Sequence, residues 1–228
     1  MIGSVHLADV GVGNALAALR TTLRPGSRPG LRYGALMLAA PLSGSLLPRP
    51  NPGRIGLLAF WDDDEALDNF LAEDPVATRF AQGWHVRLEP IRHTGDWPGL
   101  SEQPAHGHTS GPAVTVTLGR LRLPGAARFL RASARTQAQV LAAPGLLWGT
   151  GLSRPPVVAT CSLWRSVGDL AAYAHRPGRH ADAIAEDRKR PFHHRSIFIR
   201  ARPRDSVGQL AGRNPLAADW STAGAEHR

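Results

Sequence analysis

The sequence predicts an α+β protein in which one β-α-β-β-α-β unit occurs twice in tandem. The first observation is an internal repeat, since "PGLRYG" at 29–34 returns as "PGLLWG" at 144–149. The second is a longer match, in which "LLAFWDDDEALDNFLAEDP" at 57–75 returns as "TCSLWRSVGDLAAYAHRPG" at 160–178. Both matches occur in the same order, each where a turn enters a strand or a strand enters a helix. We therefore infer two structurally equivalent halves.

Each half contains the same six elements in the same order. The strands alternate apolar and polar residues and the helices show a period of three to four. In the first half we expect a strand at 3–12, a helix at 14–23, a strand after 29–34, a strand ending at Trp61, a helix and a strand at 84–91. In the second half the corresponding elements are 112–121, 126–141, a strand after 144–149, a strand ending at Trp164, a helix and 195–203. Such ferredoxin-like units leave one sheet face bare, and packing two sheets face to face covers both.

Composition changes set the expected boundaries. Residues 1–92 form the first repeat and residues 113–203 the second. Residues 93–112 are rich in Gly, Pro, Ser and His and indicate a linker. Residues 204–228 lose periodicity and indicate a loosely ordered tail.

Charge and cysteine content narrow the function classes. The 228 residues include 27 Lys plus Arg against 18 Asp plus Glu, a net charge of +9. The arginines are scattered, with no compact basic run and no RNA-binding or zinc-finger motif, which disfavours a nucleic-acid partner. The single Cys161 excludes an intramolecular disulfide and a thiolate metal site. Nothing indicates export or a membrane span, so we expect a cytoplasmic protein.

Two motifs are better explained by structure than by ligand binding. Gly11-Val12-Gly13 lies where a dinucleotide-binding loop would lie, but Leu16 replaces the small residue that such a loop needs, so we expect a tight turn. The acidic run 62–65 begins a helix, where carboxylates cap free N–H groups, and Ser166 is the expected cap in the second half.

Two histidine pairs do not have the spacing of a metal site. His106 and His108 lie in the predicted linker without a carboxylate or cysteine nearby. His193 and His194 are adjacent, so in an extended strand their rings point to opposite sides. We expect no structural zinc at either pair.

His180 departs from the repeat. Aligning Trp61 with Trp164 places Ala77 opposite His180, so only one half carries this histidine. It lies in the first turn of a predicted helix, on the face of Ala183 and Ile184, where the helix dipole disfavours the imidazolium and keeps the ring neutral, as a metal ligand must be. A partly exposed histidine at a helix start explains the position equally well.

Several segments resemble the spheroidene monooxygenase family, the acyclic carotenoid ketolases. They are "GLLAFWDDDEALDNFLAEDPVATRFAQ" at 56–82, Gly95-Asp96-Trp97, residues 117–164 and "HADAI" at 180–184. The resemblance extends in order from about Ile55 to Arg202. It implies a dimeric α+β barrel within one chain and an oxygen-dependent monooxygenase that binds haem and oxidises a long apolar polyene.

The resemblance implies the role of His180, and four further residues are candidates around it. His180 matches the histidine of the family's His-x-x-Ala-Ile helix, which implies an axial iron ligand that leaves the opposite face open for oxygen. Trp164, Tyr173 and Phe192 are candidate cofactor-binding residues, although core packing accounts for each of them as well. Arg87 is the candidate catalytic polar group near bound oxygen. One departure is Arg190-Pro191-Phe192, where the family tends to carry an acidic-Trp-Phe run, and it leaves the substrate open.

Three functions therefore stand at this point. The first is a haem-dependent monooxygenase whose partners are an apolar small-molecule substrate and molecular oxygen. The second is a cofactor-free oxygenase or isomerase of the α+β barrel type, in which His180 would be a general base. The third is a non-enzymatic barrel that binds an apolar ligand or an anionic partner. The sequence leaves the electron donor, peripheral membrane contact and homo-oligomerisation open.

Overall fold

The computed structural model describes residues 1–228 apart from 46–50, 103, 105–110, 176–190 and 217–228. Eight strands close into one barrel, in which every neighbouring pair is antiparallel and the order is β1-β3-β2-β6-β7-β5-β8-β4. The strands are β1 (Ile2–Asp9), β2 (Leu31–Pro41), β3 (Arg54–Trp61), β4 (Trp84–Gly95), β5 (Ala113–Leu121), β6 (Leu146–Arg154), β7 (Val157–Trp164) and β8 (His193–Gly208). The predicted fold class, tandem ferredoxin-like repeats forming a dimeric α+β barrel within one chain, is confirmed.

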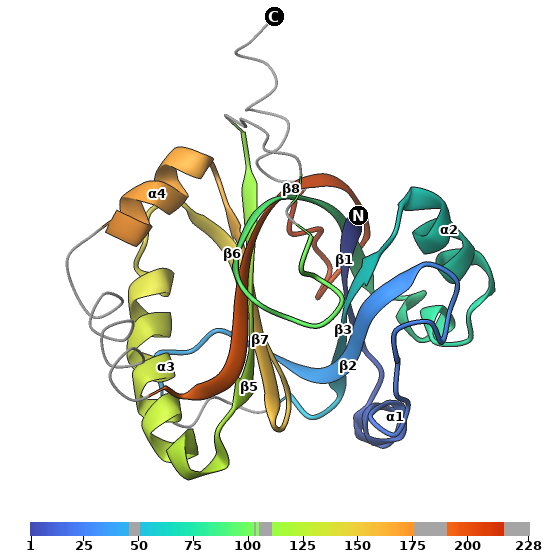
Figure 1. The fold of residues 1–228 in the computed structure, drawn as a ribbon, viewed down its shortest axis with the longest axis horizontal. Helices are drawn as coiled ribbons and strands as arrows, with labels where there is room; N and C mark the ends of the chain where they lie inside the picture. Colours follow the sequence, from blue (N-terminus) through green and yellow to red (C-terminus); the bar gives the residue numbers. More distant parts are fainter. Residues whose placement is uncertain (46–50, 103, 105–110, 176–190, 217–228) are drawn as a thin grey trace, which may run out of the picture.

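The helices lie outside the barrel, on two opposite sides (Figure 1). Helices α1 (Val12–Ala18) and α2 (Asp64–Glu73), with the short helix η1 (Ala77–Phe80), cover the sheet of the first half. Helices α3 (Ala126–Leu141) and α4 (Val167–His175) cover the sheet of the second half, and η2 (Leu123–Gly125) precedes α3. Each half therefore contributes four strands and one helical layer.

The repeat holds at the level of strand register. Trp61 pairs with Ile2 and Leu31, and Trp164 pairs with Ala113 and Leu146. A register shift follows both Leu31 and Leu146, inside the two copies of the PGLxxG segment. The extra residues of the first half lie between β2 and β3, where residues 42–53 replace the two-residue connection 155–156.

Apolar side chains fill the inside of the barrel. Alternate residues of each strand point inward, as the period of a pleated sheet requires. Trp97 and Leu100 of the predicted linker and Leu216 of the predicted tail join this interior cluster. β4 extends to Gly95 and β8 to Gly208, beyond the boundaries expected at 92 and 203. These parts of the linker and the tail are structured because their large apolar side chains are buried at the barrel.

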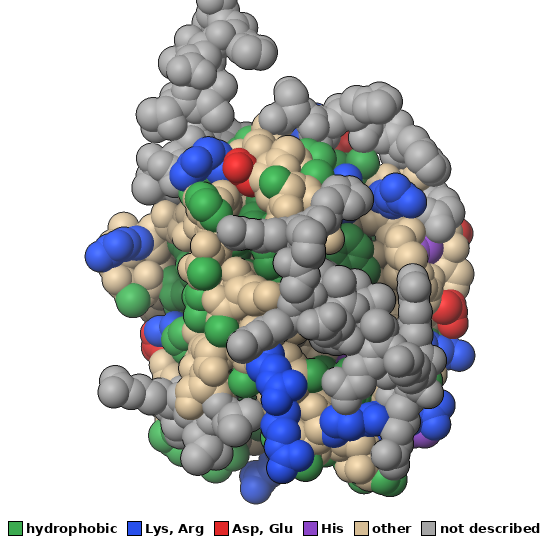
Figure 2. Space-filling model, turned by 90° about the vertical axis from the view of Figure 1, so that its left-hand side faces the viewer, with side chains coloured by type: hydrophobic (Ala, Val, Ile, Leu, Met, Phe, Trp, Pro, Cys, Tyr) green, Lys and Arg blue, Asp and Glu red, His purple; other side chains and the backbone are tan. Residues whose placement is uncertain are grey.

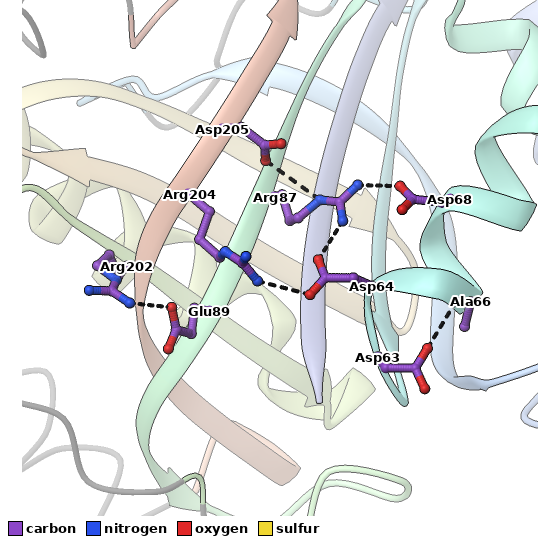
Figure 3. Close-up of polar contacts among 9 residues, drawn as sticks. All are labelled: Asp63, Asp64, Ala66, Asp68, Arg87, Glu89, Arg202, Arg204 and Asp205. Carbon is purple, nitrogen blue, oxygen red and sulfur yellow. Dashed lines mark hydrogen bonds and ion pairs between the residues drawn. The ribbon is translucent and has the colours of Figure 1, made fainter.

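The local predictions at the helix starts are confirmed. The Asp63 carboxylate accepts a hydrogen bond from the Ala66 N–H at 2.9 Å and caps α2 (Figure 3). Ser166 Oγ accepts a hydrogen bond from the Asp169 N–H at 3.0 Å at the start of α4. Gly11 has a φ of 78° immediately before α1, which a tight turn requires and which glycine adopts without strain.

Candidate functional site

The outer faces of the two sheets can be compared position by position because the repeats share one register. In the first half Leu36, Leu57 and His6 point outward toward the helices, and all three are buried. The matching residues of the second half are Gly151, Thr160 and Thr117. Gly151 and Thr160 are half-buried and Thr117 is exposed. The second half therefore has smaller and more accessible side chains on this face.

The space beside Gly151 can accommodate a side-chain Cβ. A Cβ added at Gly151 would meet no atom closer than the Ala40 carbonyl oxygen, at 3.8 Å. In the first half the matching position carries Leu36, whose side chain is buried in the layer under the helices. At the edge of the same face Phe198 pairs with Thr117 and is 37% exposed. A flat apolar group could rest on this part of the sheet without displacing a core residue.

The helices also approach the two sheets differently. In the first half α1 packs against β3. The matching helix of the second half, α3, packs less closely against the matching strand, β7. Buried apolar side chains from α1, α2 and η1 fill the layer on the first sheet, among them Ala15, Leu67, Phe70 and Phe80. Of the described residues on the second side, only Ala113, Ala143, Trp164 and Leu170 form the buried centre of such a layer.

Trp164 and Tyr173 lie together in this layer. Their ring centroids are 5.0 Å apart, and Trp164 is fully buried. The Trp164 indole N–H donates to Ser162 Oγ at 2.9 Å, and Ser162 Oγ shares a 2.7 Å hydrogen bond with Thr115 Oγ1. Burial raises the pKa of Tyr173 to about 12, so its phenol stays protonated at neutral pH. Both residues lie on the helix-covered side of the second sheet rather than inside the barrel.

Phe192 belongs to a separate aromatic cluster beside α3. It is buried, with its ring 6.1 Å from that of Phe129, and the guanidinium of Arg128 lies 4.7 Å above it. The His193 ring packs against Phe129 at 5.3 Å and against Gly119, where an added Cβ would collide with it. Phe192 thus lies on the second half, in a different cluster from Trp164, and its role in binding a cofactor stays a prediction.

Arg87 is placed in the first half. Its guanidinium forms ion pairs with Asp64 and Asp68 of α2 and lies 3.5 Å from Asp205 of β8 (Figure 3). Arg204 also binds Asp64, at 2.9 Å. These ion pairs join α2 to β4 and β8 on the outside of the barrel. A catalytic role for Arg87 beside bound oxygen stays a prediction.

His6 and His85 form a histidine pair that the sequence did not single out. His6 is fully buried, stacks on His85 with centroids 5.1 Å apart, and contacts Phe70 and Phe80. Neither ring nitrogen of His6 has a hydrogen-bond partner in the part of the chain that the structure describes. Burial, with a smaller contribution from His85, lowers the pKa of His6 to about 3. The only sequence signal for this pair was a histidine in the alternating strand "GSVHLADV". Its neighbours are those of an ordinary strand and do not set it apart.

His180, the predicted iron ligand, lies outside the described residues, as do His106 and His108. Within the described ranges no group of three or more His, Cys, Asp or Glu side chains is arranged to hold a metal ion. Cys161 is buried inside the barrel, and burial raises the pKa of its thiol to about 12. Among the helices that the structure describes, none is long and apolar enough to cross a membrane.

Comparison with known proteins identifies the relatives of the chain. No protein-family model matches it. The chain is 30% identical over 194 residues to a spheroidene monooxygenase from Rubrivivax gelatinosus, a match that covers 81% of this chain and 73% of the relative. It is 25% identical over 181 residues to the spheroidene monooxygenase of Rhodobacter capsulatus, a match that covers 75% of each chain.

A solved structure supports the fold alone. An aldoxime dehydratase in complex with butyraldoxime superposes with a TM-score of 0.55 at 9% identity, covering 94% of this chain and 84% of that one. The resemblance seen in the sequence is thus confirmed, and the chain belongs to the spheroidene monooxygenase family.

Proposed function

We propose that the chain is a haem-dependent monooxygenase that inserts oxygen into a carotenoid-like or other apolar substrate. The family relationship supports the reaction class. The observation that supports a bound cofactor is the outer face of the second sheet, which has small side chains. There Gly151, Thr160 and Thr117 stand at the positions of Leu36, Leu57 and His6 in the first sheet.

The residues on this face fit a flat apolar ring. Gly151 places no side chain on this face, and Phe198 and Thr117 offer an aromatic ring and a hydroxyl side by side in register. Trp164 and Tyr173 close the layer toward α4 with packed rings. His180, which follows α4 in the chain, would hold the iron. The chemistry that haem supplies when bound is the activation of molecular oxygen.

The surroundings of this face suit an apolar substrate. None of Gly151, Thr160, Thr117 and Phe198 carries a charge, and the charged side chain next to them on this face is Arg200, which pairs with Thr115. A substrate of this class would be held by apolar surface, with few polar groups to fix its orientation. The protonated Tyr173 adds an uncharged wall at neutral pH.

The absorption spectrum of protein purified from haem-supplied cells tests the proposal. We expect an intense Soret band in the parent that is lost or shifted in His180→Ala. Thr115→Ser, a conservative change at a buried hydroxyl, is the matched control and should keep the parent spectrum. A colourless parent that takes up no added hemin would contradict haem dependence and would favour the cofactor-free oxygenase.

A further inference from the structure

Helix α3 turns an apolar stripe away from the barrel. Its inward side carries Ala132, which is buried, and Val140, which packs on the cluster of Trp164. Residues 127, 130, 134, 138 and 141 recur every three to four positions and lie on the other side of the helix, where Ala134 is buried, and Leu123 belongs to η2 just before α3. Leu123 of η2 is 70% exposed, and Leu130 and Leu141 of α3 are 53% and 50% exposed, an unusual exposure for large apolar side chains on two adjacent elements.

Part of this stripe is covered by the loop that follows β2. The Ser43 N–H donates to Gln137 Oε1 at 2.8 Å, and a Cβ added at Gly44 would lie 2.9 Å from the Ala138 Cβ. The loop contacts α3 at Gln137 and Ala138, whereas Leu141 at the end of the helix is exposed. Leu123 and Leu130, at the N-terminal half, remain on the surface.

Arginines border the exposed part. α3 contains Arg128, Arg131 and Arg135 and no acidic residue, and Arg122 lies just before η2. Arg131 and Arg135 are exposed, on the flank of the helix next to the leucines. Among the residues that the structure describes on the face of α3 and α4, arginine and hydrophobic side chains lie beside one another with few carboxylates (Figure 2).

We propose that the α3 stripe, defined as Leu123, Ala127, Leu130, Arg131 and Arg135, docks on the surface of an anionic lipid bilayer. Leucines on one flank and arginines on the next match the apolar and charged layers of such a surface. In a symmetric dimer formed through this surface, these arginines would face the same arginines of the second copy across a twofold axis, and the like charges would repel each other. A nucleic acid would engage the arginines but leave the leucines in water. The surface stands on observations separate from the cofactor, and it would bring the enzyme to the phase in which an apolar substrate dissolves.

Co-sedimentation of the full chain with vesicles tests this surface. We expect binding to vesicles of phosphatidylcholine mixed with phosphatidylglycerol and much weaker binding to phosphatidylcholine alone. Leu123→Ser combined with Leu130→Ser should weaken binding at least about tenfold, since each leucine loses its burial in the bilayer. Arg131→Gln combined with Arg135→Gln should weaken it about tenfold or more at low salt.

Leu16→Ser is the matched control, because Leu16 is 54% exposed on a helix of the other half. It should bind vesicles as the parent does. Absence of vesicle binding by the parent, or binding that the leucine changes leave intact, would overturn the proposal. A leucine double variant that converts a dimer to a monomer would overturn it too, because the stripe would then contact a second copy. The Soret band is recorded separately, so failure of this surface and failure of the haem assignment can be told apart.

Discussion

The two halves of this barrel share one topology and differ in what lies between sheet and helices. The first half buries Leu36, Leu57 and His6 under α1, α2 and η1, whereas the second half has Gly151, Thr160 and Thr117 in the same register. A structural layer needs bulky side chains because interiors are close-packed. Under the proposed function, the smaller residues at the matched positions are where a ligand would take the place of packed side chains. On that proposal, one copy of the duplicated unit serves as scaffold and the other as the site.

Removing the matched tryptophans should give the largest effects on stability. Trp61→Ala should lower the free energy of unfolding by about 3–5 kcal/mol, because Trp61 is fully buried and packs 4.8 Å from the Phe70 ring. Trp164→Ala should cost less, since its smaller neighbours can collapse into the cavity. Urea denaturation followed by circular dichroism measures both values. Equal losses would show that the two layers are packed alike.

Acid should destabilise the protein because His6, in the first half, is buried in its neutral form. The unfolded pKa of histidine, 6.5, exceeds the folded pKa of His6, about 3, so the unfolded chain binds more protons between these values. The contribution of His6 to the free energy of unfolding is complete above pH 6.5. It is lost as the pH falls toward 3, at up to about 1.4 kcal/mol per pH unit.

His6→Leu should flatten this pH dependence, because a leucine suits the cage of Phe70 and Phe80 and does not titrate. The free energy of unfolding at several pH values between 7 and 4, measured for parent and variant, checks the prediction. Parallel curves would mean that His6 is not the group that responds to acid. Thr117→Val, the matched change in the second half, should leave the curve unaltered.

The helix caps should give the smallest effects and nearly equal ones in the two halves. Asp63→Ala and Ser166→Ala each remove the acceptor for a free N–H at a helix start, at 2.9 and 3.0 Å. Each should lower the free energy of unfolding by about 1 kcal/mol. Chemical denaturation of the two variants measures the costs side by side. A cost several times larger in one half would mean that its helix is held mainly by the cap.

The sequence predicted the parts of the fold that have local signals. The repeat, both caps and the turn at Gly11 were readable because each depends on residues a few positions apart. The ion pairs of Arg87 were not readable, since they join α2, β4 and β8. Closure of the barrel through the β2–β6 and β4–β8 pairs also has no local signal and followed only from the family resemblance.

The candidate site was predictable only in part. His180 emerged from the sequence because it breaks the repeat, and its role stays a prediction. The small outer-face residues of the second sheet did not emerge, because Gly151 and Leu36 can be compared only after the strand register is known. His6 was overlooked because a histidine in an alternating strand has no feature that distinguishes burial from exposure.

Hemin titration of a chain in which the outer face of the second sheet has been filled tests the central claim most directly. Gly151→Leu combined with Thr160→Leu would give the second sheet the residues of the first, and Val207→Leu, on an exposed part of β8, is the control. The account predicts that the filled variant melts at the same temperature as the parent or higher and binds hemin at least about tenfold more weakly. A filled variant that binds hemin as tightly as the parent would contradict the assignment of this face as the cofactor site.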